Sequence, residues 1–267
     1  MLSGSGVGGG TLVNRMTSIS TPEDVRAEWA ADHGLAQVCG STWDADVAAV
    51  ESELGVTTTT VIPPKDAAIL RGAAELGWEA APTRRNAADC GACGSCPFGC
   101  TRGTKQSGIR VHLVQACAAG ARIVPRVRVL KILLEGGRAV GVAGTAVVTD
   151  PVTGDPIGHP DRPGEVMTRP VVVRAPVVVL SAGALRTPGI LQATGLEHPS
   201  IGRHLRLHPV PVLAGRFREP IDMWRGPMQA ARSLQFGKGE PGRNGYVIEA
   251  APGHPGLLAL ALPWEGT

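Results

Sequence analysis

The chain has 267 residues, of which 43% are hydrophobic and 18% charged, and its formal net charge is +3. This composition supports a sizeable core and excludes a wholly disordered chain. The basic residues are scattered, without a Lys/Arg run or interleaved aromatic residues, so no nucleic-acid partner is predicted. No apolar run approaches membrane-spanning length, and the N-terminus has no signal-peptide pattern. We therefore expect a cytoplasmic protein without a membrane span, unless a targeting signal precedes this sequence.

Helices are predicted for the first half of the chain. Capping-box patterns begin at Thr21 and Ser41, and a glycine follows the end of each periodic segment. We expect helices over residues 21–33, 41–54, 66–76 and 107–119.

Strands are predicted for the second half. Residues 123–130 have a strand pattern, and Glu135-Gly136-Gly137-Arg138 predicts a hairpin turn into a strand over 139–148. The apolar run 171–180 is typical of a strand buried on both faces, as in a parallel sheet. A small-residue turn at 181–184 and a helix over 187–195 follow it, and ligands of open α/β sheets bind at such an edge.

Four of the six cysteines are closely spaced. The spacing is that of one half of a bacterial ferredoxin, so an iron–sulfur electron-transfer protein is the alternative function. Thr101 stands where the ferredoxin pattern has proline. The other possibilities are a zinc site, disulfides and a buried cluster that stabilises its loop; we expect no bound metal. The four residues are Cys90, Cys93, Cys96 and Cys100, while the isolated Cys39 and Cys117 are predicted to be buried thiols.

A glycine-rich segment opens the chain. Residues 4–9 match the pattern G-x-G-x-x-G, but a dinucleotide-binding fingerprint must follow a buried strand, and only three residues precede Gly4. Two interpretations remain. The segment is a flexible tail, or its glycines let the backbone approach a bound group closely.

Several segments together resemble the glucose–methanol–choline (GMC) oxidoreductase family. Residues 7–14, V-G-G-G-T-L-V-N, are similar to a segment of that family that contacts FAD, and residues 181–196 are similar to its second signature. Residues 121–142 resemble the strand pair that covers the adenine, and 201–209 resemble the segment that leaves the FAD domain. The cysteine-rich insert, followed by Gly103-Thr104-Lys105, is similar to the long-chain alcohol oxidase subgroup.

The resemblance implies an α/β fold. A partial FAD-binding, Rossmann-like domain of the GMC type would occupy residues 1–200, with the cysteine-rich insert at about 86–103. Residues 201–267 would begin an α+β substrate-binding domain. FAD is the implied cofactor, and the implied contacts are Gly8, Gly9, Gly10, Thr11, Asn14, Val129, Ala182 and Gly183.

The implied reaction is oxidation of the CH–OH group of a small-molecule alcohol, by hydride transfer to the flavin while a base takes the alcohol proton. The sequence assigns neither the alcohol nor the electron acceptor. The family's first FAD-binding strand and its C-terminal catalytic histidine have no counterpart here. We therefore expect a truncated form, or an inactive fragment, without measurable activity on its own. His204 and His208 are predicted to satisfy backbone groups, and His254 lacks the flanking family pattern.

Overall fold

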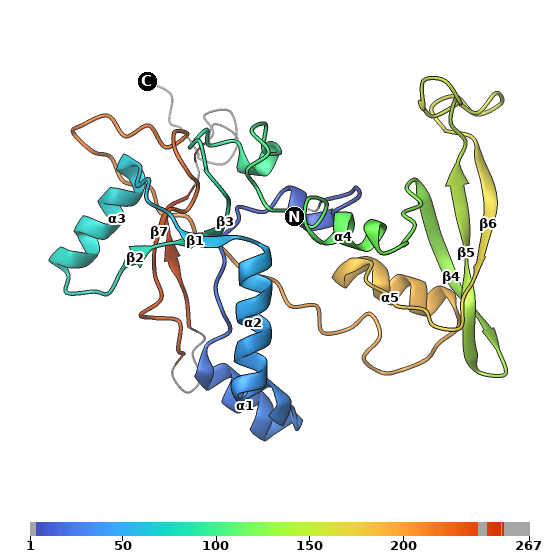
Figure 1. The fold of residues 1–267 in the computed structure, drawn as a ribbon, viewed down its shortest axis with the longest axis horizontal. Helices are drawn as coiled ribbons and strands as arrows, with labels where there is room; N and C mark the ends of the chain where they lie inside the picture. Colours follow the sequence, from blue (N-terminus) through green and yellow to red (C-terminus); the bar gives the residue numbers. More distant parts are fainter. Residues whose placement is uncertain (1–3, 240–244, 252, 254–267) are drawn as a thin grey trace. The chain divides into compact units, whose positions relative to one another are not determined.

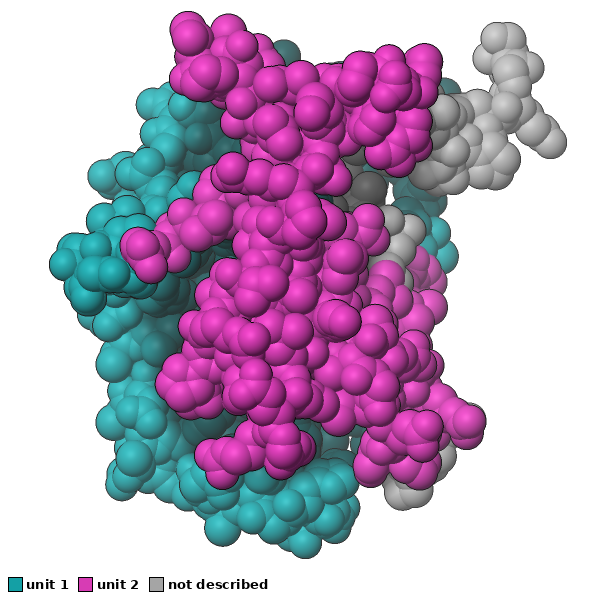
Figure 2. All heavy atoms as spheres, turned by 90° about the vertical axis from the view of Figure 1, so that its right-hand side faces the viewer, with its two compact units in different colours: residues 1–121, 212–267 teal, residues 122–211 magenta. Residues whose placement is uncertain are grey.

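The computed structural model describes residues 4–239, 245–251 and 253. The chain divides into unit 1, residues 1–121 and 212–267, and unit 2, residues 122–211 (Figure 2). Both units combine helices and strands, so the fold is mixed α/β. The predicted domain boundary at residue 200 does not coincide with this division and stays a prediction.

The N-terminal part of unit 1 is helical. The 3-10 turn η1 (Gly9–Leu12) precedes helices α1 (Glu23–His33) and α2 (Ser41–Glu53), with the short η2 (Ala36–Val38) between them (Figure 1). The predicted end of α1 is confirmed, since Gly34 adopts the left-handed conformation with φ of 66°.

The predicted capping boxes of α1 and α2 are wrong, because no side chain caps either helix. Pro22 occupies the N-cap of α1, which leaves Thr21 one residue outside the helix. Gly40 occupies the N-cap of α2, which places Ser41 inside it.

The remaining described residues of unit 1 form helices α3 and α4 and two small antiparallel sheets. Helix α3 spans Pro64–Glu75, and α4 spans His112–Ala118, starting later than predicted because residues 108–111 form turns. Another 3-10 turn, η3, covers Cys96–Phe98. In one sheet, β1 (Val56–Thr58) pairs with β3 (Arg84–Asn86). In the other, β7 (Ala231–Ser233) lies between β2 (Ala81–Pro82) and β8 (Ile248–Glu249).

A small apolar cluster joins four separate segments of unit 1. Met16, Ala87, Cys96 and Met228 are buried in it, and the half-buried Cys90 packs against it. The cysteine-rich loop therefore contributes directly to the core. Cys39 and Cys117 are exposed, so the prediction that they are buried is wrong.

A buried ion pair ties α3 to the segment that leads into β7. The ammonium group of Lys65 contacts the carboxylate of Asp66 and donates to the carbonyl of Pro227 at 2.8 Å. The other carboxylate oxygen of Asp66 accepts from the backbone N–H of Ala231 at 2.9 Å. Asp66 is fully buried, so its charge depends on these partners.

Unit 2 is built on one antiparallel sheet. Strands β4 (Val127–Glu135), β5 (Arg138–Val147) and β6 (Thr168–Arg174) lie in that order, and the predicted hairpin at Glu135–Arg138 is confirmed. Helix α5 (Gly183–Ala193) lies against β4. The hydroxyl of Thr194 accepts from the backbone N–H of Ile132 at 2.9 Å and donates to the carbonyl of Ile190 at 2.7 Å, which ties the end of the helix to the strand.

The apolar run 171–180 is only partly a strand. Its first residues belong to β6, but residues 177–180 are in no strand, and Val177 and Val179 are 73% and 81% exposed. A strand buried on both faces needs partners on each side. Every pairing among the described strands is antiparallel, so the predicted parallel strand is not formed there.

None of the helices in the described ranges is long and apolar enough to cross a membrane. The cytoplasmic location stays a prediction.

The buried pair in α3 predicts a large loss of stability for Asp66→Ala. The substitution leaves the Lys65 ammonium buried without its counter-ion, which typically costs about 3–5 kcal/mol. The exposed Asp46 of α2 provides a matched control, and Asp46→Ala should change stability by about 0.5 kcal/mol or less. Urea denaturation monitored by circular dichroism measures both. Equal effects of the two substitutions would contradict the role of the pair.

Candidate functional site

The glycine-rich segment of unit 1 is an ordered turn that leads into η1. Gly8 and Gly9 have φ of 97° and 54°, in the left-handed region that favours glycine. A Cβ atom built on Gly9 or Gly10 would meet no atom within 4 Å. The backbone at these positions therefore borders open space, which a ligand can approach closely.

Thr11 holds this turn in place. Its hydroxyl donates to the carbonyl of Gly8 at 2.5 Å and accepts from the backbone N–H of Gly108 at 3.1 Å. The predicted cofactor-contacting hydroxyl thus has a structural role, and its second lone pair is left for a ligand. Asn14 is exposed, so its side-chain amide lies at the surface of the same segment.

Lys105 connects the glycine segment to the cysteine-rich loop. Its ammonium group donates to the carbonyl oxygens of Leu12 at 2.8 Å, Asn14 at 2.7 Å and Cys96 at 3.3 Å. The residue is only 3% exposed. The sequence pattern Gly-Thr-Lys marked this residue as part of a subgroup signature. The pattern did not indicate that its ammonium group holds the glycine segment in place.

The surroundings of Lys105 lower the pKa of its ammonium group. Burial lowers the pKa of its ammonium group, and the nearby positive charge of Arg85 lowers that pKa further. Negative charge on the sulfur atoms of Cys96 and Cys100 acts in the opposite direction. Among the described residues, no carboxylate forms an ion pair with Lys105, so its three carbonyl partners hold the charge in place.

The remaining predicted FAD contacts lie in unit 2. Val129 is on β4 opposite Gly144 and beside a register shift in the strand. The backbone N–H of Ala182 donates to the hydroxyl of Thr187 at 3.1 Å, and Gly183, with φ of 86°, begins α5. The predicted contacts are therefore divided between the two units, and neither unit by itself contains the full set.

The four closely spaced cysteines do not converge. All are free thiols; Cys96 is buried, Cys90 and Cys100 are half-buried, and Cys93 is exposed. In the described ranges, no group of three or more His, Cys, Asp or Glu side chains is arranged to hold a metal ion. The sulfur of Cys96 instead accepts a hydrogen bond from Arg85 Nη2 at 3.4 Å.

His204 and His208 are not positioned as catalytic bases within the described residues. His204 and His208 are exposed, and neither imidazole forms a hydrogen bond within the part of the chain that the structure describes. The prediction that they satisfy backbone groups is therefore wrong, because the segment around them runs along the surface. His254 lies outside the described residues.

Cys100 has hydrogen-bond partners that favour its thiolate. Burial by itself raises the pKa of a thiol. The Thr104 hydroxyl, 3.4 Å from the sulfur, and the backbone N–H groups of Lys105, Thr104 and Arg102 outweigh that effect. The pKa of Cys100 is consequently lower than that of an ordinary cysteine.

Comparison with known proteins identifies relatives across the chain. A family model described as GMC oxidoreductase matches residues 1–210. An uncharacterized GMC-type oxidoreductase of Mycobacterium tuberculosis (strain ATCC 25618 / H37Rv) is 35% identical over 267 residues, covering 98% of this chain and 39% of that protein.

Two long-chain-alcohol oxidases of Arabidopsis thaliana are also similar. One is 32% identical over 238 residues, covering 85% of this chain and 30% of the oxidase. The other is 30% identical over 280 residues, covering 100% of this chain and 36% of the oxidase. The chain therefore spans between 30% and 39% of the length of these relatives.

The surroundings of Cys100 predict an unusual pH dependence of alkylation. Because the folded state lowers the pKa of Cys100, its reaction with iodoacetamide should begin at lower pH in the native chain than in the guanidinium-denatured chain. Thr104→Val removes one donor and should shift the native midpoint upward. Peptide mass spectrometry follows each cysteine separately. A native Cys100 that reacts only at or above the pH of the denatured one would rule out this stabilised thiolate.

Proposed function

The chain belongs to the GMC oxidoreductase family, and on that premise we propose that it forms part of an FAD-dependent enzyme that oxidises the CH–OH group of an alcohol. The match of residues 1–210 to the family model carries this proposal. The names of the plant relatives, long-chain-alcohol oxidases, support a small-molecule alcohol as the class of substrate.

The residues of the glycine segment fit a flavin cofactor. Family members generally bind FAD. The left-handed glycines and the open space beside Gly9 and Gly10 leave room for a group that approaches the backbone closely. Thr11 and Asn14 add an acceptor and an exposed amide on the same turn. When bound, FAD would supply the redox chemistry by accepting a hydride from the alcohol.

The contacts in the rest of the FAD domain are part of the same proposal. We infer that Val129 lies against the adenine and that Ala182 and Gly183 approach the cofactor at the start of α5. The small residues at that helix start support this role, because a Cβ atom on Gly183 would also meet open space. The proposed arrangement is Rossmann-like, with the FAD-binding part over residues 1–200 and the substrate-binding part beginning at 201.

We assign no catalytic base among the described residues. The reaction needs a group that takes the alcohol proton, and a general base typically contributes about 10²–10⁴-fold to the rate. His204 and His208 are exposed and unpartnered in the part of the chain that the structure describes, so nothing there orients either imidazole. The proposed role of this chain is to position the cofactor.

The glycine segment predicts loss of FAD on Gly9→Val. We suggest a hybrid protein in which the flanking segments come from the mycobacterial relative, with FAD content measured by visible absorbance after purification. Val at position 9 would occupy the open space beside the backbone and should abolish FAD binding and alcohol-driven flavin reduction.

Gly77→Val is the matched control, because Gly77 has a similar φ of 66° and also borders open space, at the end of α3. The two substitutions introduce comparable backbone strain at different places. Normal FAD content in a folded Gly9→Val hybrid, or equal loss in both variants, would contradict the proposed role of the segment.

A further inference from the structure

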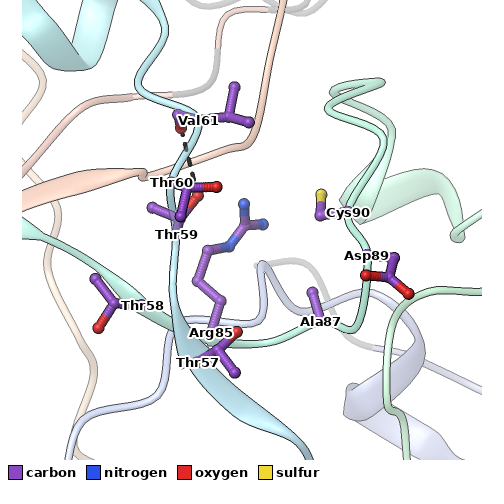
Figure 3. A pocket seen from close by; sticks show the side chains of 9 residues that line it. All are labelled: Thr57, Thr58, Thr59, Thr60, Val61, Arg85, Ala87, Asp89 and Cys90. Atoms are coloured by element: carbon purple, nitrogen blue, oxygen red, sulfur yellow. Dashed lines mark hydrogen bonds between the residues drawn. The ribbon is translucent and has the colours of Figure 1, made fainter.

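Arg85 extends from β3 into a cavity within unit 1. The cavity has a volume of about 320 Å³ and lies beside β1, where Thr57 is paired with Arg85. Figure 3 shows the guanidinium group pointing into the space between the segment that carries Thr60 and the loop that carries Cys90. Val61, Ala87, Asp89 and Cys90 also line the cavity.

The guanidinium group has more donors than partners. Arg85 is only 2% exposed. Its Nη2 atom donates to the carbonyl of Arg15 at 3.1 Å and to the sulfur of Cys96 at 3.4 Å. The Nε and Nη1 atoms are buried and have no hydrogen-bond partner among the described residues. Because a guanidinium group is always protonated in proteins, this side chain carries a buried charge with unused donors.

The nearby charges do not neutralise Arg85. The buried ammonium of Lys105 is close enough for the two positive charges to repel, and Cys96 accepts hydrogen bonds from both residues. Asp89 also lines the cavity, but it forms no ion pair in the described ranges. This part of the unit therefore has an excess of buried positive charge.

We propose that the cavity beside β1 binds a small organic carboxylate, whose head group accepts hydrogen bonds from the Nε and Nη1 donors of Arg85. Carboxylates match the charge and the hydrogen-bonding geometry of guanidinium groups. The cavity volume corresponds to roughly ten water molecules, which is more than an inorganic ion fills. Val61 and Ala87 are the aliphatic residues of the lining, and a short aliphatic chain can pack against them. The site does not depend on FAD, so it is separate from the proposed redox function.

Saturation-transfer NMR on the purified 267-residue chain tests this proposal without a flavin. Sodium butyrate is the probe, and n-butanol is its uncharged counterpart of similar shape. Butyrate should give a saturable signal that n-butanol does not give. Arg85→Gln should weaken butyrate binding about tenfold or more, since a hydrogen-bonded charge is lost. Arg71→Gln is the matched control, because Arg71 is exposed on α3, and this variant should bind butyrate normally.

A second variant covers the case in which Arg85→Gln does not fold. Val61 is 43% exposed, so Val61→Phe can fill part of the cavity without overpacking the core, and it should also abolish the butyrate signal. Equal binding of butyrate and n-butanol, unchanged binding in Val61→Phe, or no butyrate binding by the wild-type chain would overturn the proposal. Displacement of butyrate by an equal concentration of inorganic phosphate would contradict the assignment to an organic carboxylate.

Discussion

The buried ammonium group of Lys105 joins two segments that are far apart in the sequence. It donates to the backbone of the glycine segment at Leu12 and Asn14 and to the backbone of the cysteine-rich loop at Cys96. Lys105 is buried, and leaving a buried donor without an acceptor costs about 1–3 kcal/mol, so these bonds fix the path of the glycine segment. The hydroxyl of Thr11 adds a second tie, to Gly108. The glycine segment, which is proposed to contact FAD, is thus held in place by hydrogen bonds from Lys105 and Gly108.

This arrangement gives the cysteine-rich loop a structural function. Cys96 accepts from Lys105 through its carbonyl and from Arg85 through its sulfur, and its side chain packs with Met16 and Met228. A buried thiol in these contacts acts as a small apolar group with a weak acceptor. The same loop borders the cavity at Arg85 through Cys90. The loop therefore connects the glycine segment, the core of unit 1 and the proposed carboxylate site.

The sequence correctly predicted those elements whose structure depends only on residues adjacent in the chain. The helix end at Gly34 and the hairpin at Glu135–Arg138 require only a glycine of suitable φ, and the sequence contains it. The prediction of one buried strand over residues 171–180 was wrong for its last part, residues 177–180. An apolar run becomes a buried strand only when other strands pair with it, and no parallel partner occurs among the described residues.

Only the part of the candidate site that lies in a recognisable sequence motif could be predicted. The glycine segment was found from its resemblance to a family signature, whereas Lys105 and Arg85 act through contacts with residues tens of positions away. No periodicity or spacing indicates which lysine or arginine of a chain is buried.

The most direct test of the central claim is hydrogen exchange on Lys105→Met in the hybrid protein, combined with its FAD content. If Lys105 holds the glycine segment, this variant should show faster amide exchange over residues 8–14 and lose bound FAD. The exposed Lys131 of β4 gives the matched control, and Lys131→Met should change neither quantity. Unchanged exchange over residues 8–14 together with normal FAD content in Lys105→Met would contradict the claim.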